Sequence, residues 1–266
     1  MPKPSRYAQI IEDIFLANYK GGESSVSFSR EEIEKSASRL NLPLVKNIGD
    51  LIYTFRFRRD LPDAILERAH CGKLWVIALK GDAEYAFELR TFVHIHPDPA
   101  LPVVKVPDAT PGIVSRYALS DEQALLAKLR YNRLLDIFTG VACYSIQNHL
   151  RTKLERMGQI ETDEIYVGID KRGAHYVIPV QAKGKGDRLG IVQIEQDFEL
   201  CREKFPDLLA RPIAAQFMDD MTIALFEFDD DPDDGVVKLA ERHYRLVPEQ
   251  DLSREELRIY RNRRTD

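Results

Sequence analysis

The chain has 266 residues, of which 44% are hydrophobic and 30% are charged, and its formal net charge is −5. Three widely spaced cysteines without a CxxC pair argue against a disulfide-stapled secreted protein, and no apolar run is long enough to span a bilayer. We therefore predict a soluble cytoplasmic protein with no membrane partner. The net charge neither suggests nor excludes nucleic acid, because a local basic strip is enough to bind phosphates.

The N-terminal part of the chain predicts three helices followed by a hairpin. Apolar residues recur at helical spacing in the first helix, and Ser29 with Glu32 forms a capping-box pattern at the start of the second. A Lys-Gly-Asp turn separates two apolar runs, as in a hairpin. This order of elements is that of a winged helix, so we predict a winged-helix-like DNA-binding domain. Its helices are expected at residues 6–19, 29–40 and 44–55, and its strands at residues 74–79 and 84–89.

Polar and basic residues of this domain are the predicted DNA contacts. In a winged helix the third helix enters the major groove, and the tip of the hairpin forms the wing. The arginines that follow the third helix alternate with phenylalanines, which equally fits an amphipathic strand with solvated arginines. The predicted contacts are Lys46, Asn47, Arg56, Arg58, Arg59 and Lys80.

Five prolines lie between Pro97 and Pro111. Proline removes backbone donors and favours extended chain, so this stretch is interpreted as a linker. The resulting division is a DNA-binding domain over residues 1–96, a linker over 97–118 and a second domain over 119–266.

The second domain is expected to combine helices with a small mixed sheet. A largely helical segment is followed by two strands joined by a Lys-Arg-Gly turn, then by a helix and a further strand. This is an α/β pattern, and with the N-terminal domain it places the whole chain in the mixed α+β or α/β class. The helices are predicted at residues 120–156 and about 190–204, and the strands at residues 163–170, 176–183 and about 222–228.

The two central strands bring a set of polar groups to neighbouring strand ends. Asp163 begins the first strand, and Gln181-Ala182-Lys183 ends the second. Gln181 and Lys183 are two residues apart and share one face of the strand. A carboxylate, an amide oxygen and a backbone carbonyl suit Mg²⁺, and a lysine suits the negative charge of a phosphodiester undergoing hydrolysis. The alternative is a buried strand whose end carries solvated polar residues.

These residues resemble the metal-binding core of the PD-(D/E)XK nuclease superfamily, the restriction-endonuclease-like fold. Asp163 and Gln181-Ala182-Lys183 resemble in particular its Q-x-K branch, which includes Mrr-like enzymes. The chain departs from the family pattern in two ways: Thr162 stands before Asp163 in place of proline, and neutral Gln181 replaces the second carboxylate. The resemblance implies that Asp163, Gln181 and the Ala182 carbonyl hold Mg²⁺. It also implies that Lys183 activates the attacking water or stabilises the transition state.

Other residues around this core are candidates for accessory roles. Acids or amides on adjacent elements would compensate for the neutral Gln181, and a glutamate on the preceding helix would enter the site as in many relatives. The accessory candidates are Glu155, Glu161, Glu164, Gln193 and Glu195. Lys185 and Arg188, just beyond the site, are predicted to contact the DNA backbone.

The resemblance implies a magnesium-dependent deoxyribonuclease, a type II restriction-like endonuclease that hydrolyses double-stranded DNA. One active site per domain predicts a homodimer for double-strand cleavage. The alternative function is a DNA-binding regulator or scaffold whose nuclease fold is catalytically inactive, which Gln181 favours. The two hypotheses differ in magnesium dependence and in the effect of Lys183→Ala.

Overall fold

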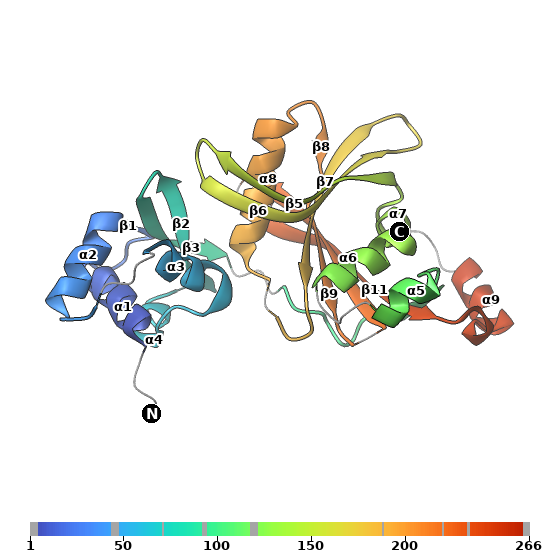
Figure 1. Cartoon of the computed structure of the whole chain (residues 1–266), viewed down its shortest axis with the longest axis horizontal. Helices are drawn as coiled ribbons and strands as arrows, with labels where there is room; N and C mark the ends of the chain where they lie inside the picture. Colours follow the sequence, from blue (N-terminus) through green and yellow to red (C-terminus); the bar gives the residue numbers. More distant parts are fainter. Residues whose placement is uncertain are drawn as a thin grey trace.

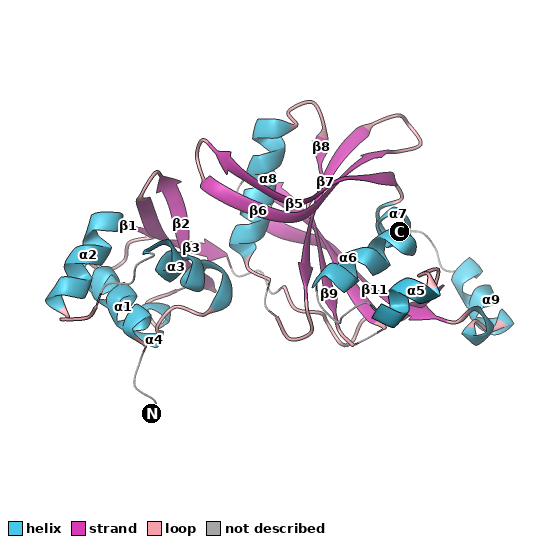
Figure 2. Ribbon diagram, in the orientation of Figure 1, coloured by secondary structure: helices cyan, strands magenta, loops and turns pink. Residues whose placement is uncertain are grey.

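The computed structural model describes residues 5–43, 48–70, 72–91, 95–117, 122–187, 189–219, 221–232 and 235–262. It is a mixed α+β structure with two sheets, each beside its own helices (Figures 1 and 2). Within these ranges, no helix combines the length and the apolar character needed to cross a membrane.

The N-terminal unit packs helices against a three-stranded antiparallel sheet of order β1-β3-β2. The three predicted helices and the hairpin are present, and β1 is an additional strand. The Glu32 carboxylate accepts from the backbone N–H of Ser29 at 2.8 Å, as the capping-box pattern predicts. The elements are α1 (Arg6–Asn18), β1 (Ser25–Ser29), α2 (Arg30–Arg39), α3 (Ile48–Tyr53), a π-helical turn (Thr54–Arg58), α4 (Asp63–Leu66), β2 (Lys73–Gly81) and β3 (Glu84–Thr91).

The core of this unit combines aliphatic side chains with a group of packed aromatic rings. Phe15 of α1 is fully buried, and its ring makes edge contacts with the rings of Trp75 and Phe87, with ring centroids 5.1 Å apart in both pairs. The buried residues of this cluster all come from the N-terminal unit. Three further clusters lie in the second unit, so each sheet has its own core.

The second unit is built on a larger mixed sheet of order β4-β11-β10-β9-β7-β6-β5, with β8 paired to β7. The strands β5, β6 and β7 form an antiparallel meander, and α8 then crosses over to β9, which is parallel to β7. The elements are β4 (Val103–Pro107), α5 (Gly112–Tyr117), α6 (Glu122–Tyr131), α7 (Leu134–Thr139), β5 (Ala142–Leu154), β6 (Gly158–Ile169), β7 (His175–Lys183), α8 (Ile191–Lys204), β8 (Leu209–Ala210), β9 (Ile213–Phe217), β10 (Thr222–Asp231), β11 (Gly235–Val247) and α9 (Arg254–Asn262).

Helices cover both faces of this sheet. Val180 and Ala182 of β7 pack in the cluster that includes α6 and α7, whereas Val177 packs in a cluster with α8. Alternate side chains of one strand point to opposite faces, so α6 and α7 lie on one face and α8 on the other. The polar end of β7 therefore lies between α6 and α8.

The prediction of helix over residues 120–156 is wrong beyond residue 139. Gly140 ends α7 with a left-handed φ of 68°, a conformation that glycine adopts without a Cβ penalty. Residues 142–154 form β5, the edge strand that pairs with β6. The local pattern was ambiguous because this strand is largely exposed and lacks a clean alternation of apolar residues.

The sheet is also larger than predicted. The strands β9 and β11 were not expected. The sequence of β11 is rich in charged residues, as in a solvent-exposed terminal segment. The segment 97–118, predicted as a linker, contains β4, which pairs in parallel with β11. Tyr260 of α9 accepts through its hydroxyl from the Lys105 N–H of β4 at 3.0 Å, so α9 covers part of this outer strand.

Candidate active site in the cleft between the two units

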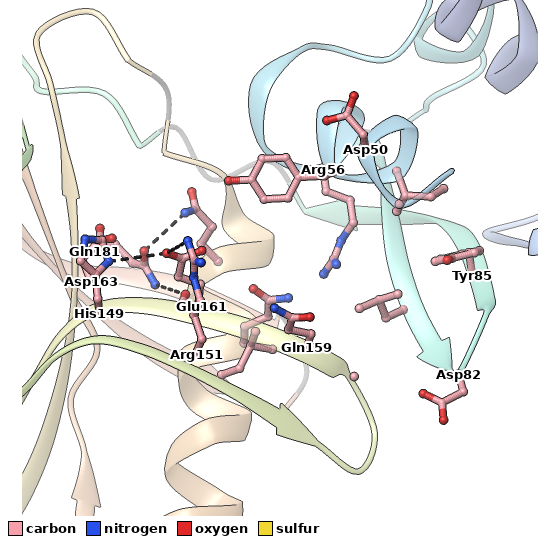
Figure 3. Close-up of a pocket in the computed structure, with 18 of the residues that line it drawn as sticks. Asp50, Arg56, Asp82, Tyr85, His149, Arg151, Gln159, Glu161, Asp163 and Gln181 are labelled. Carbon is pink, nitrogen blue, oxygen red and sulfur yellow. Dashed lines mark hydrogen bonds and ion pairs between the residues drawn. The ribbon is translucent and has the colours of Figure 1, made fainter. Parts of the chain in front are cut away.

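A cleft of about 1110 Å³ separates the N-terminal unit from the end of the second sheet. The close-up in Figure 3 shows Arg56 and Tyr85 on the side of the N-terminal unit, and Asp163, Gln181 and Glu161 on the opposite wall. The predicted metal ligands Asp163 and Gln181, and Lys183, thus line a cleft formed by both units.

Two ion pairs join the units beside this cleft. Arg90 Nε of β3 lies 2.8 Å from Glu195 Oε1 of α8, and Lys153 Nζ of β5 lies 2.9 Å from the carboxylate of Asp82 in the β2–β3 turn. Glu195, an accessory candidate, is therefore committed to the contact between units. Ion pairs of this kind fix orientation more than they add stability.

The expectation that Asp163 begins its strand is wrong, because β6 begins at Gly158 and Asp163 lies in the middle of it. The backbone of β7 holds its carboxylate there. Its Oδ2 accepts from the Ala182 N–H at 2.8 Å, and the side chain is only 8% exposed. Burial raises the pKa of Asp163, although the Ala182 N–H and the positive charge of Lys183 favour its ionised form. The Ala182 side chain is buried on the other face of the strand.

Lys183 lies next to a carboxylate that sequence reasoning did not select. Its Nζ is 3.0 Å from Oε1 of Glu122, in the first turn of α6, and the Lys183 side chain is 14% exposed. The expectation that Glu155 enters the site from the preceding helix is wrong, because Glu155 lies in the turn between β5 and β6. The glutamate on the preceding helix is Glu122, and it also lines the cleft.

Gln181 is almost completely buried and bonded to a carboxylate behind it. Its Nε2 donates to both oxygens of Asp197, at 3.1 and 3.0 Å, and to the Glu161 carbonyl at 3.3 Å. The Gln181 Oε1 accepts from Gln193 Nε2 at 3.4 Å. Gln193, an accessory candidate, therefore contacts the predicted metal ligand directly.

Asp197 is the main site residue that sequence reasoning missed. It is fully buried on α8, and Thr162 Oγ1 donates to its Oδ1 at 2.7 Å. Burial raises the pKa of Asp197 to about 7, a shift increased by the charge of Asp163 and opposed by the hydrogen bonds from Thr162 and Gln181. Asp197 is one of four acidic residues on α8, and which of them points inward depends on the packing of that helix.

The two remaining acidic candidates lie on different faces of the sheet. Glu161 lines the cleft, where its Oε1 is 3.1 Å from Arg151 and 3.5 Å from the His149 ring. Glu164 is fully buried on the face covered by α6, 3.1 Å from Arg130, with a further hydrogen bond from Ser145. Glu164 is therefore placed away from the cleft.

The predicted DNA contacts are distributed unevenly. Lys46, Asn47 and Arg188 lie outside the described residues, as does the side chain of Arg58. Arg56 lines the cleft, where burial lowers its pKa to about 10 while Tyr85 and Glu195 act in the opposite direction. Arg59 and Lys185 are exposed, and Lys80 near the hairpin tip forms an ion pair with Glu88.

The oxygen donors fit a magnesium ion that keeps several waters. Among the residues that the structure describes, no group of three or more His, Cys, Asp or Glu side chains could hold a metal. Mg²⁺ is commonly bound through only one or two protein carboxylates, with water and substrate oxygens completing the shell. Asp163, the Gln181 amide oxygen and the Ala182 carbonyl provide donors of this type, with Glu122 nearby.

Comparisons with protein-family models, with curated proteins and with solved structures found no match for this chain. Its function is therefore argued from the arrangement of its own residues.

Proposed function

We propose that this protein is a magnesium-dependent endonuclease that hydrolyses phosphodiester bonds in double-stranded DNA. The observation that carries this proposal is that Asp163, in the middle of β6, lies beside Gln181 and Lys183 at the end of β7, on the wall of one large cleft. A carboxylate, an amide and an ammonium group in one accessible place are the groups that metal-assisted hydrolysis requires.

The roles follow from the chemistry of each group. Asp163, Gln181 Oε1 and the Ala182 carbonyl would hold Mg²⁺, which would polarise the phosphate and lower the pKa of a bound water. The ammonium group of Lys183 would stabilise the charge that develops on the phosphate. Glu122, 3.0 Å from Lys183, holds this ammonium group in place and is the accessory carboxylate.

The connectivity around the site supports the same proposal. A helical segment, an antiparallel meander, a crossover helix and a strand parallel to β7 follow one another from α6 to β9. The resemblance to restriction-endonuclease-like proteins implies a mixed sheet with helices on both faces. The N-terminal unit, with three helices and a hairpin, would supply DNA contacts across the cleft, with Arg56 on that side.

Asp163→Asn tests this proposal. With plasmid and bacteriophage DNA, we expect the wild-type protein to produce cleavage products with Mg²⁺ and none with EDTA. The variant is expected to lose at least about 100-fold in rate, because an amide binds Mg²⁺ less strongly than a carboxylate does. Absence of metal-dependent cleavage on every DNA tested would contradict the nuclease function. Sedimentation of the protein bound to a DNA that it cleaves would test the predicted homodimer. A protein that is only monomeric on that DNA would count against it.

A second candidate function is a DNA-binding regulator or scaffold without cleavage. It is favoured by the neutral Gln181 and by the ion pair that engages Lys183 with Glu122. This candidate predicts salt-sensitive DNA binding that does not require Mg²⁺ and that Asp163→Asn leaves nearly unchanged. Measuring binding and cleavage on the same DNA at several salt concentrations separates the two functions.

A further inference from the structure

The direction of the Gln181 carboxamide decides whether this residue can hold a metal. A carboxamide has an acceptor oxygen and a donor NH₂ group of nearly the same shape, and only the oxygen can bind Mg²⁺. Gln181 lines the cleft beside Asp163, so the end of the amide that faces the cleft sets the chemistry of the site (Figure 3).

The inner end of this amide meets only acceptors in the contacts that the structure gives. Nε2 lies 3.1 and 3.0 Å from the two oxygens of Asp197, and 3.3 Å from the carbonyl of Glu161. The backbone carbonyl of Glu161 has no proton to donate, and neither has Asp197 in its ionised form, which the hydrogen bonds from Thr162 and Gln181 favour. If the amide were reversed, its oxygen would face these oxygens, at the cost of buried unsatisfied acceptors.

The outer end of the amide meets a donor. Gln193 Nε2 lies 3.4 Å from Gln181 Oε1, so the neighbours on both sides favour the same direction. Thr162 in turn donates to Asp197 at 2.7 Å and fixes that carboxylate. A carboxylate that accepts from the NH₂ group also polarises the amide, which increases the negative charge on its oxygen.

We propose that Asp197 is a positioning residue that turns the Gln181 carboxamide so that its oxygen faces the cleft as a metal ligand beside Asp163. This inference rests on the proposed metal-dependent function. A glutamate at position 181 would supply a negative charge directly to the metal. Here Asp197 of α8 carries that charge, one hydrogen bond further from the metal.

Exchanging the amide of Gln181 and the carboxylate of Asp197 tests the proposal. In Asp197→Asn, the new amide can donate or accept, so the residue at position 197 no longer selects the direction of the Gln181 amide. We expect its affinity for Mn²⁺, measured by calorimetry in competition with Mg²⁺, to fall by about 10- to 100-fold. In the double variant Gln181→Glu/Asp197→Asn, the asparagine NH₂ donates to the new carboxylate, and the Mn²⁺ affinity should return to the wild-type level or exceed it.

Two further variants separate positioning from a merely structural role. Gln181→Glu alone places two buried carboxylates in contact, so the metal-free protein should melt at a lower temperature than the double variant does. Thr162→Val removes the other hydrogen bond to Asp197 while keeping the contact with Gln181. It should lower the melting temperature but change the Mn²⁺ affinity less than Asp197→Asn does.

The results also distinguish this inference from the proposed function. Unchanged Mn²⁺ affinity in Asp197→Asn, or a double variant that binds no better than Asp197→Asn, would overturn the positioning role even if the wild-type protein cleaves DNA. The expected pattern of affinities without DNA cleavage would support the positioning role and contradict the nuclease. A wild-type protein that binds no Mn²⁺ would overturn both.

Discussion

Lys183→Ala is expected to lower the rate of magnesium-dependent DNA cleavage by about 100- to 1000-fold, the usual cost of removing one group that stabilises charge in a transition state. The Lys183 ammonium group lies at the end of β7 and is held 3.0 Å from Glu122 on α6. Its position beside Asp163 is fixed by the strand, and no other described side chain is expected to take its place. Single-turnover rates at saturating Mg²⁺ measure the effect.

The same variant should fold normally and retain DNA binding. Glu122 is 41% exposed, so water can solvate its carboxylate once the lysine is removed. Lys185→Ala is the matched control, since Lys185 is exposed just beyond the strand and is expected to affect binding more than the chemical step. A Lys183→Ala protein that cleaves at the wild-type rate would contradict the assigned role. If the wild-type protein never cleaves DNA and Lys183→Ala binds DNA as tightly as the wild-type protein does, the regulator function is favoured.

Removal of one partner from the ion pair between Arg211 and Glu227 is expected to destabilise the second unit strongly. Arg211 Nε and Nη2 lie 2.6 and 2.9 Å from the two carboxylate oxygens, and Nη1 donates to the Thr139 carbonyl at 3.1 Å. This guanidinium therefore joins the end of α7 to β10. Arg211→Met leaves the mostly buried Glu227 carboxylate without its partner and should lower the free energy of unfolding by about 3 kcal/mol.

Urea unfolding of single and double variants tests this prediction. Arg211→Met/Glu227→Leu removes both charges and should be more stable than either single variant, because no unpaired carboxylate is buried. Arg172→Met is a suitable control, since Arg172 is highly exposed and its ion pair with Asp170 is expected to contribute little. Equal stability of Arg211→Met and the wild-type protein would show that the pair does not hold these elements together.

Some of the fold was predictable because the signals were local. Helix α1 was expected from its periodicity, α2 from Ser29 and Glu32, and the β2–β3 hairpin from its turn. The strands β6 and β7 were apolar runs joined by a turn, and this connection placed Asp163 and Lys183 close together. The strands β5 and β11 were missed because their pairing partners lie in other parts of the chain, and their own residues are largely polar or exposed.

By itself, the sequence determined the polar set that two neighbouring strands bring together. Strand alternation and a short turn connect Asp163, Gln181 and Lys183 through residues that are close in the chain. Only the tertiary structure decided which distant groups complete the site. Glu122 reaches Lys183 because α6 begins beside the end of β7, and Asp197 reaches Gln181 because α8 packs on the face of the sheet to which Gln181 points. Burial and long-range packing, which local sequence patterns do not encode, turn these two carboxylates toward the site.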